Sequence, residues 1–260
     1  MAVLLDIQHV SKHFGGVAAL DDVTMRVEQG DTVGVIGPNG AGKTTLFNCI
    51  TGVLRPEQGA VMFGRATHES LLGLAPHHIV ERGIARTFQN IRLFSSMSVL
   101  DNVIVGTYLR THTGIVGSLL SSGGSRREER WAYERAMGLL ELVSLSARAD
   151  EPSGALPFGL QRRLEIARAL ATEPALLLLD EPAAGLNPVE KQQLMKLIKQ
   201  LNDQGLTTLL IEHDMQVVMP ISRRVVVLDY GKVIAEGPPE AIQRDERVIE
   251  AYLGAPHAAP

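Results

Sequence analysis

Four short stretches of this chain are mostly apolar, and each is followed by polar residues. Such runs are typical of strands in a parallel sheet that helices cover on both faces. Between the second and the third run, apolar residues recur at helical spacing over residues 189–201. A strand, an amphipathic helix and a second strand in this order predict a right-handed crossover unit, and hence an α/β fold. The four runs are residues 32–36, 175–179, 207–211 and 225–228.

The rest of the pattern separates a strand-rich beginning from a helical middle. Residues 3–36 carry alternating or short apolar runs, which predict strands and turns, and residues 58–64 predict one more strand. From about residue 76 to residue 171 we expect helices and polar loops. Within this part, residues 111–125 are rich in Gly, Ser and Thr and are expected to form a mobile loop. The charged residues that follow are expected to begin a helix over 126–142.

Composition narrows the class of protein. The 260 residues suffice for one large α/β domain, and a hydrophobic content of 45% supports a well-buried core. The formal charge of −4 does not indicate a nucleic-acid partner. The single cysteine, Cys49, excludes an internal disulfide and is expected to be a packed core thiol in a reducing compartment. No apolar run approaches the ~18–20 residues that a bilayer-spanning helix needs, so we expect a soluble protein whose membrane role comes through a partner.

A glycine-rich stretch directly follows the first apolar run. Residues 37–44 read Gly-Pro-Asn-Gly-Ala-Gly-Lys-Thr, between a predicted strand and a predicted helix at 45–50. The glycines allow a tight turn whose N–H groups point at one anion, and the helix N-terminus adds partial positive charge. Lys43 can reach the β- and γ-phosphates of a nucleotide, and the Thr44 hydroxyl can bind Mg²⁺. This stretch predicts a nucleotide-binding protein.

Polar side chains follow the next two apolar runs, at the place where α/β sheets bind ligands. Asp180 suits Mg²⁺, and Glu181 is then placed to polarise a water that attacks the γ-phosphate. His213 follows the third run and can contact the γ-phosphate. Gln89 lies where strands give way to helices, and its amide oxygen can reach Mg²⁺ or the attacking water. Together these residues predict nucleotide hydrolysis.

A second anion site is predicted at a helix N-terminus. Pro157 and Gly159 open a helix that runs to about Ala171, and its first-turn N–H groups point outward. One phosphate loop already serves the nucleotide of this chain. We therefore expect the second site to face the nucleotide of another subunit.

In combination, these stretches resemble the nucleotide-binding subunit of an ATP-binding cassette (ABC) transporter, over almost the entire chain. The resemblance implies ATP and Mg²⁺ as cofactors, with Glu181, His213, Gln89 and Lys43 in catalysis. Thr44, Gln89 and Asp180 are implied for the metal. Phe14 is implied as the aromatic that stacks on adenine, with a core phenylalanine as the alternative. The other implied nucleotide contacts are Gly37, Pro38, Asn39, Gly40, Ala41, Gly42, Lys43, Thr44 and Thr45 of the Walker A loop, and Pro157, Phe158, Gly159 and Gln161 of the signature motif.

The same resemblance implies the fold and its parts. We expect a P-loop NTPase with a RecA-like, mostly parallel sheet, an antiparallel β subdomain and a helical subdomain, as one ABC ATPase domain over 1–260. The expected parts are 1–88 (β subdomain and P-loop part of the core), 89–165 (helical subdomain with an insert at 110–130), 166–235 (rest of the core) and 236–260 (C-terminal helical tail).

More narrowly, the chain resembles the ATP-binding subunits of branched-chain amino acid importers, and among them the larger of the two ATPases. The resemblance implies an ATPase that powers import by dimer closure coupled to membrane permeases. Its implied partners are a second ABC ATPase subunit, two transmembrane permease subunits and, indirectly, a substrate-binding protein. Its implied location is cytoplasmic, on the inner face of the cell membrane. The stretches that carry this resemblance are 36–40, 86–89, 162–168, 181–188 and 251–254.

Two stretches depart from the family's pattern. The signature usually reads Leu-Ser-Gly-Gly-Gln, but here Pro157 and Phe158 replace the serine and the first glycine, so a hydroxyl contact with the γ-phosphate is lost. The D-loop at 184–188 has Asn187 where many members have Asp. We therefore expect a heterodimer in which the partner's serine-type signature completes the site on this chain, and a homodimer stays open.

Other functions also stay open from the sequence alone. Within the family they are the ATPase of a urea or amide importer, the ATPase of a lipid or lipopolysaccharide exporter, and a soluble ABC ATPase of DNA repair or translation. A small-molecule P-loop kinase shares the phosphate loop. Such a kinase does not need the signature helix or the arrangement of Asp180, Glu181 and His213.

Overall fold

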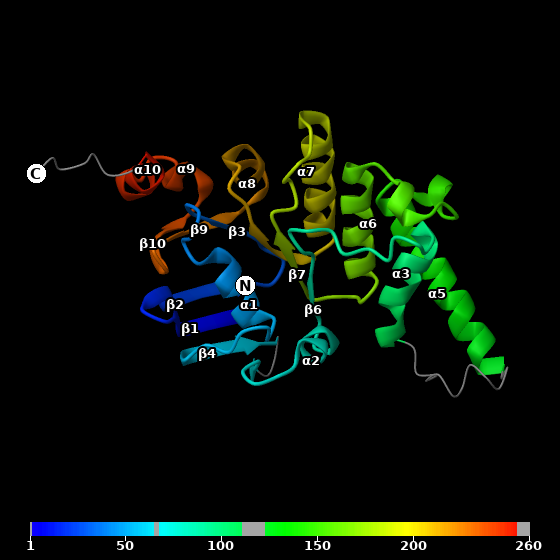
Figure 1. The fold of residues 1–260 in the computed structure, drawn as a ribbon, viewed down its shortest axis with the longest axis horizontal. Coiled ribbons are helices and arrows are strands. Elements are labelled where there is room, and N and C mark those ends of the chain that lie inside the picture. Colours follow the sequence, from blue (N-terminus) through cyan, green and yellow to red (C-terminus); the bar gives the residue numbers. More distant parts are fainter. Residues whose placement is uncertain (1, 65–67, 111–122, 254–260) are drawn as a thin grey trace, which may run out of the picture.

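The fold is built on a six-stranded, mostly parallel sheet. The computed structural model describes residues 2–64, 68–110 and 123–253, and the strand order is β10-β9-β3-β8-β7-β6. Strands β9, β3, β8, β7 and β6 run parallel, and β10 pairs antiparallel with β9 at one edge (Figure 1). Each of the four predicted apolar runs is a strand of this sheet, which confirms the α/β fold. The bounds are Thr32–Ile36 (β3), Ile84–Arg86 (β6), Leu176–Asp180 (β7), Thr207–Ile211 (β8), Arg224–Asp229 (β9) and Lys232–Gly237 (β10).

Burial on both faces explains why these strands are apolar throughout. In β7, Leu176 and Leu178 join the core on the side of helix α1 (Lys43–Ile50), whereas Leu177 and Leu179 join the core on the opposite side. Cys49 of α1 is 3% exposed, so the predicted core thiol is confirmed.

A second, antiparallel sheet contains the strand-rich beginning of the chain, as predicted. Its order is β2-β1-β4-β5, and its apolar residues share one core with α1 and with one face of the central sheet. Helix α1 therefore lies in a layer that both sheets enclose (Figure 1). The bounds are Val3–Phe14 (β1), Val17–Glu28 (β2), Gln58–Phe63 (β4) and Glu69–Ser70 (β5).

Helices from the middle of the chain form a group at the β6 end of the central sheet (Figure 1). Helix α6 packs against α3, α5 and β6. The predicted helix at 126–142 is α5, which begins three residues earlier, at Gly123. Most of the predicted mobile loop at 111–125 lies outside the described residues. The bounds are Pro76–Glu81 (α2), Val99–Thr107 (α3), Tyr108–Arg110 (η1), Gly123–Leu142 (α5), Ser146–Arg148 (η2), Ser153–Ala155 (η3) and Phe158–Leu170 (α6).

The remaining helices come after strand β7 in the sequence. Asn187 and Glu190 form a capping box at the start of α7, which explains why the predicted crossover helix begins there. Two short helices end the described chain, within the expected tail at 236–260, whose extent stays a prediction. Within the described ranges, no helix is both long and apolar enough to cross a membrane. The bounds are Pro188–Asp203 (α7), Met215–Ile221 (α8), Pro239–Ile242 (α9) and Glu246–Leu253 (α10).

Candidate functional site

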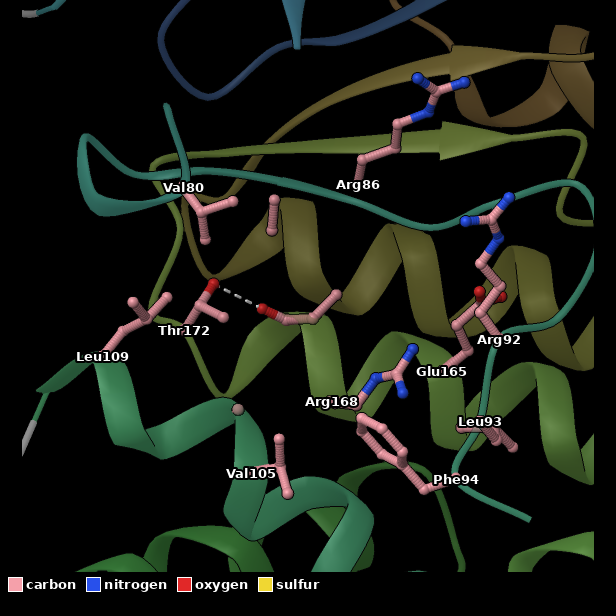
Figure 2. A pocket seen from close by; sticks show the side chains of 13 residues that line it. Val80, Arg86, Arg92, Leu93, Phe94, Val105, Leu109, Glu165, Arg168 and Thr172 are labelled. Atoms are coloured by element: carbon pink, nitrogen blue, oxygen red, sulfur yellow. Dashed lines mark hydrogen bonds between the residues drawn. The ribbon is translucent and has the colours of Figure 1, made fainter. Parts of the chain in front are cut away.

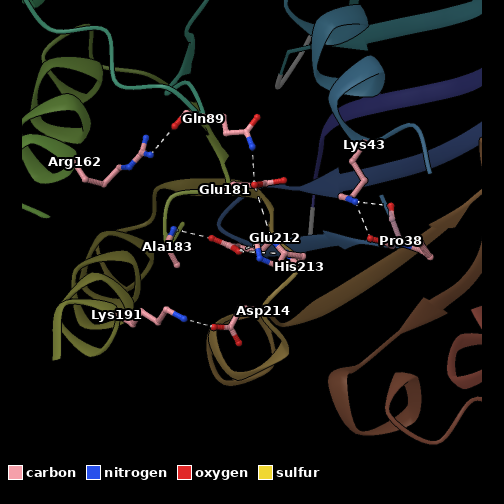
Figure 3. A network of polar contacts seen from close by, with 11 residues as sticks. Pro38, Lys43, Gln89, Arg162, Glu181, Ala183, Lys191, Glu212, His213 and Asp214 are labelled. Carbon is pink, nitrogen blue, oxygen red and sulfur yellow. Dashed lines mark hydrogen bonds and ion pairs between the residues drawn. The ribbon is translucent and has the colours of Figure 1, made fainter. Parts of the chain in front are cut away.

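Three strands of the central sheet end side by side, at the edge where the candidate residues follow them. Strand β8 pairs with β3, where Val35 lies opposite Ile211, and with β7, where Ile211 lies opposite Asp180. The glycine-rich loop follows β3, and the candidate acids and histidine come at the ends of β7 and β8. The register therefore brings the loop, the acids and the histidine to one edge of the sheet (Figure 3).

The glycine-rich loop needs glycine at two positions for steric reasons. Gly37 has φ +152°, and a Cβ atom there would lie 2.1 Å from the carbonyl oxygen of Leu228. Gly42 caps α1 with φ +103°, and a Cβ atom there would lie 2.2 Å from the carbonyl oxygen of Ala19. Both conformations disfavour any residue with a side chain. The loop is thus packed against β9 and β2 by its backbone.

Lys43 is held by the loop itself. Its Nζ donates to the carbonyl oxygens of Gly37 at 2.7 Å and of Pro38 at 2.9 Å, and the residue is only 6% exposed. Burial lowers the pKa of Lys43, while the charges of Glu181 and Asp180 act to raise it. The ammonium group therefore lies close to both acids, among neutral carbonyls that an incoming anion can displace.

Asp180 has a partner that the sequence did not reveal. Arg86, the last residue of β6, donates from Nη2 to Asp180 Oδ2 at 2.7 Å, and both side chains are buried. The same guanidinium donates to Asn48 Oδ1 at 2.8 Å and to Thr51 Oγ1 at 3.2 Å. Asn48 belongs to α1, and Thr51 is its C-cap. Arg86 thus connects the predicted metal ligand to the helix that follows the phosphate loop.

Glu181 lies between two of the other predicted residues. Its Oε2 accepts a hydrogen bond from Gln89 Nε2 at 2.9 Å and lies 3.8 Å from His213 Nδ1 (Figure 3). The Glu181 backbone has φ +45°, a left-handed conformation that is uncommon outside glycine, and its N–H donates to Ile211 O at 2.9 Å. The structure therefore brings Gln89, Glu181 and His213 together.

Another buried acid, Glu212, contacts the backbone next to Glu181 and His213. Glu212 is fully buried, and its Oε1 accepts from the Ala183 N–H at 2.7 Å, two residues after Glu181. Its Oε2 accepts from the His213 N–H at 3.2 Å. Burial raises the pKa of Glu212, and hydrogen bonds from the backbone of Ala183, His213 and Asp214 oppose that rise.

The predicted second anion site is the N-terminus of α6. Pro157 stands at its N-cap, and Phe158 is its first residue. The Phe158 ring is half exposed and packs on the D-loop, where a Cβ atom on Gly185 would lie 3.0 Å from the ring. Gly159 faces Glu190 of α7 so closely that a Cβ atom would meet its carboxylate at 2.4 Å. Gln161 donates from Nε2 to Leu156 O at 2.9 Å, so its side chain is engaged within its own helix end.

The signature helix is joined to the Gln89 segment by a buried ion pair. Arg162 and Glu165 of α6 are 1% and 2% exposed and pair at 2.8 Å. Arg162 donates to the carbonyl oxygens of Phe88 at 2.6 Å and of Gln89 at 2.8 Å, and Glu165 accepts from the Phe88 N–H at 3.2 Å. Sequence reasoning missed this pair, although two charges on one helix face beside an apolar core were a signal.

The predicted adenine contact lies in the antiparallel sheet. Phe14 ends β1 and is 50% exposed, so the alternative of a buried core phenylalanine is wrong. The Lys12 Nζ lies 5.6 Å from the centre of the Phe14 ring. The exposed ring face can stack on a flat ligand.

The donor set at the sheet edge fits Mg²⁺ bound together with a nucleotide. Asp180 offers a carboxylate, Gln89 an amide and Thr44 an exposed hydroxyl at the start of α1. Within the described ranges, three or more His, Cys, Asp or Glu side chains are nowhere grouped to hold a metal. Mg²⁺ commonly takes one or two protein ligands and completes its shell with phosphate oxygens and water, so these donors suffice.

Family comparisons agree with this geometry. The chain matches the ABC transporter family over residues 20–184, and the branched-chain amino acid ATP-binding cassette transporter family over residues 232–258. It is 45% identical to the high-affinity branched-chain amino acid transport ATP-binding protein BraF of Pseudomonas aeruginosa, across 96% of this chain and 98% of the relative. The corresponding LivG protein of Escherichia coli is 44% identical, with the same coverage.

Solved structures of cassettes share the fold over nearly the whole chain. The ADP conformation of MJ1267, an ATP-binding cassette of an ABC transporter, is 33% identical with a TM-score of 0.84, across 98% of this chain and 100% of that one. Dimeric MJ0796, a bacterial ABC transporter cassette, is 26% identical with a TM-score of 0.76, across 91% and 99%. The chain therefore belongs to the ABC transporter family, among the branched-chain amino acid transport ATP-binding proteins.

Proposed function

We propose that this chain is the subunit that hydrolyses ATP to power an importer of branched-chain amino acids. The observation that carries the chemistry is the Glu181 carboxylate, which contacts Gln89 at 2.9 Å and lies 3.8 Å from His213, on the sheet edge that also holds Lys43. The names of the relatives BraF and LivG support the substrate class. The sequence motifs of this chain favour the larger of the two ATPases of such an importer.

ATP binding begins with the phosphate loop. The Lys43 ammonium leaves the carbonyls of Gly37 and Pro38 and turns to the β- and γ-phosphates, because a charged oxygen is a stronger acceptor than a neutral carbonyl. The loop N–H groups from Gly37 to Thr45 surround the same phosphates. Phe14 stacks on the adenine ring.

Hydrolysis depends on how Glu181 holds a water. Its carboxylate accepts a proton from the water while the oxygen attacks the γ-phosphorus in line and ADP leaves. Gln89 orients Glu181 or the water, and the half-exposed His213 donates to the γ-phosphate as charge develops there.

Thr44, Asp180 and Gln89 are the residues that would hold Mg²⁺. When bound, the ion neutralises negative charge on the β- and γ-phosphates. Arg86 keeps Asp180 oriented until then, because its 2.7 Å hydrogen bond fixes one carboxylate oxygen.

The site is completed by a second ABC ATPase subunit. The N-terminus of α6 faces the nucleotide of that partner, with Pro157 and Phe158 in place of a hydroxyl and a glycine. Loss of one charge-assisted hydrogen bond costs about 1–3 kcal/mol, which weakens the composite site that this chain's signature joins. In a heterodimer, the serine-type signature of the partner supplies this hydroxyl contact at the other composite site, which is built on the phosphate loop of this chain. The dimeric cassette MJ0796 supports the dimeric arrangement.

A groove beside the Gln89 segment is the place for a membrane permease. It has a volume of about 550 Å³ and lies between α2, α3 and α6 (Figure 2). Its walls are mostly apolar, with Val80, Leu93, Phe94, Val105 and Leu109, and Arg168 lies over the Phe94 ring at 5.6 Å. Arg162 of α6 donates a hydrogen bond to the Gln89 carbonyl oxygen, so α6, which lines the groove, is linked to the ATP site. A permease segment bound in the groove would therefore move with changes at the ATP site.

The location follows from these partners. Two permeases bind the paired ATPase subunits on the cytoplasmic, inner face of the cell membrane, and a substrate-binding protein meets the permeases on the other side. This chain never touches the amino acid.

Mass spectrometry of trapped complexes tests the proposal. Tagged Glu181→Gln protein is loaded with ATP in gently solubilised membranes and purified, with the wild-type chain in ADP as the control. We expect two multi-span permeases and a second, shorter ATPase. Recovery of soluble proteins, ribosomes or DNA alone contradicts the transport assignment and leaves the ATPase chemistry in place.

A further inference from the structure

Glu212 makes contacts that neither nucleotide binding nor the predicted motifs require. It directly follows Ile211, the last residue of β8, and it is fully buried at the edge of the sheet where the candidate residues lie. Its two oxygens accept from two separate backbone segments, the Ala183 N–H at 2.7 Å and the His213 N–H at 3.2 Å. Figure 3 shows the carboxylate between these segments.

Each of the two segments carries one reacting group. Ala183 comes two residues after Glu181, in a turn closed by the hydrogen bond from Ala184 N–H to Glu181 O at 3.1 Å. His213 follows Glu212 directly, and its Nδ1 lies 3.9 Å from Glu212 Oε2 and 3.8 Å from Glu181 Oε2. One buried carboxylate therefore fixes the backbone on both sides of the Glu181–His213 pair.

The two backbone donors call for a side chain that offers two acceptor oxygens. Backbone N–H groups can only donate, and the Glu212 carboxyl group places one oxygen as acceptor on each of the two N–H groups. A glutamine of the same shape keeps one acceptor but turns an NH₂ group toward one of the two N–H donors. One of the two segments then loses its partner.

We propose that Glu212 is a positioning residue for ATP hydrolysis, which holds Glu181 and His213 at the spacing that the γ-phosphate needs. This inference rests on the proposed function of the chain. Glu212 touches neither the nucleotide nor the water, and it acts through the backbone of Ala183 and His213.

The test compares ATP hydrolysis by four full-length chains, each paired with the same partner ATPase subunit: wild type, E212Q, H213A and the double variant. Single-turnover hydrolysis of radiolabelled ATP, followed for hours with protein in excess, gives rates even for slow variants. The ATP Kd and the Tm are measured in parallel, and Glu236→Gln, on the exposed β10 edge, is the matched control. We expect E212Q to lower the rate at least about tenfold, with the ATP Kd within about threefold of wild type.

The double variant separates positioning from a general structural effect. If Glu212 acts through the pair that includes His213, E212Q lowers the H213A rate by less than about twofold. A rate for E212Q within twofold of wild type, or an equal loss in both backgrounds, overturns the inference. Absence of ATP hydrolysis by the wild-type chain paired with its partner ATPase subunit overturns the proposed function and this inference with it.

A second variant covers the case in which E212Q does not fold. Glu212→Asp keeps two acceptor oxygens but withdraws them by one methylene. We expect a smaller loss of rate, again suppressed in the H213A background. A folded E212D chain with the wild-type rate overturns the inference.

Discussion

Arg86 donates a 2.7 Å hydrogen bond to Asp180, and the two side chains are only 8% and 4% exposed. The pair joins the last residue of β6 to the last residue of β7. Through Asn48 and Thr51 it also reaches the end of α1. Removing one member of a buried pair leaves an uncompensated charge, which makes this contact a sensitive test of the site's architecture.

Replacing Arg86 by Met is expected to lower the free energy of unfolding by about 3–5 kcal/mol. Adding Asp180→Asn to the same chain removes the uncompensated charge and recovers a large part of that loss. Urea denaturation measures both. The control is Arg82→Met, because Arg82 pairs with Glu69 at 3.2 Å on the surface and is expected to cost about 1 kcal/mol or less. A loss below about 1 kcal/mol for R86M contradicts the role of the pair.

Glu181→Gln is expected to lower kcat by about 10²- to 10⁴-fold, because an amide cannot accept the proton of the attacking water. The ATP Kd stays within a few-fold of wild type, since the phosphate loop is unchanged. Steady-state hydrolysis and equilibrium nucleotide binding give the two quantities. Glu236→Gln serves as the isosteric control on β10. A kcat for E181Q equal to that of the wild type would contradict a catalytic role of the Glu181 carboxylate.

Arg162→Met is expected to loosen the segment that carries Gln89. The change removes the donors to the Phe88 and Gln89 carbonyls and leaves Glu165 buried without its cation. Burial already raises the pKa of Glu165, and the charge of Arg162 is the main force that opposes this rise. Amides of residues 88–92 should exchange with deuterium at least about tenfold faster, as a loss of about 1.4 kcal/mol or more implies.

The neighbouring Arg163→Met is the control for that experiment, since Arg163 is half-buried and pairs with Gln193 of α7 rather than with the Gln89 segment. Equal exchange rates at 88–92 in the wild-type and R162M chains would show that the ion pair does not hold this segment.

Cys49 is expected to resist thiol reagents in the folded protein. Burial raises its pKa from the ordinary 9.0 to about 11, so at pH 8 the folded chain carries about a hundredfold less thiolate than the unfolded chain. Because the folded state holds its proton more tightly, this thiol's contribution to stability is complete below pH 9 and is lost as the pH rises to about 11. Iodoacetamide labelling with and without urea measures the first effect.

The second effect is read from unfolding free energies between pH 8 and 11. Cys49→Ala should show a weaker decline over this range than the wild-type chain. Rapid labelling of the folded protein at pH 8 would mean that the thiol is accessible, against its 3% exposure.

The sequence predicted well those features that are encoded locally. The strand at 207–211 has the predicted bounds, and the phosphate loop, Glu181 and His213 meet at one edge because parallel strands end together. Sequence reasoning missed the buried contacts of Arg86, Arg162, Glu165 and Glu212. Arg162 and Glu165 lie three residues apart on one helix, which was a local signal, but their contacts with Phe88 and Gln89, like those of Arg86 with Asp180 and of Glu212 with Ala183, join segments far apart in the chain and have no local spacing to indicate them.

Some predictions concern features that a single chain does not determine. The nucleotide that the α6 N-terminus faces belongs to another subunit, so the role of Pro157 and Phe158 stays a prediction. The boundaries of the expected parts at 88, 165 and 235 also stay predictions. The insert at 110–130 lies largely outside the described residues.

Uptake of radiolabelled leucine tests the central claim most directly. The gene for this chain is removed from its own cells and replaced by the wild-type sequence, E181Q or the Glu236→Gln control. We predict that removal abolishes high-affinity leucine, isoleucine and valine uptake, that wild type and E236Q restore it, and that E181Q does not although the protein is present in the membrane fraction. Restoration by E181Q, or unchanged uptake after removal, would contradict the account that ATP hydrolysis at Glu181 powers branched-chain amino acid import.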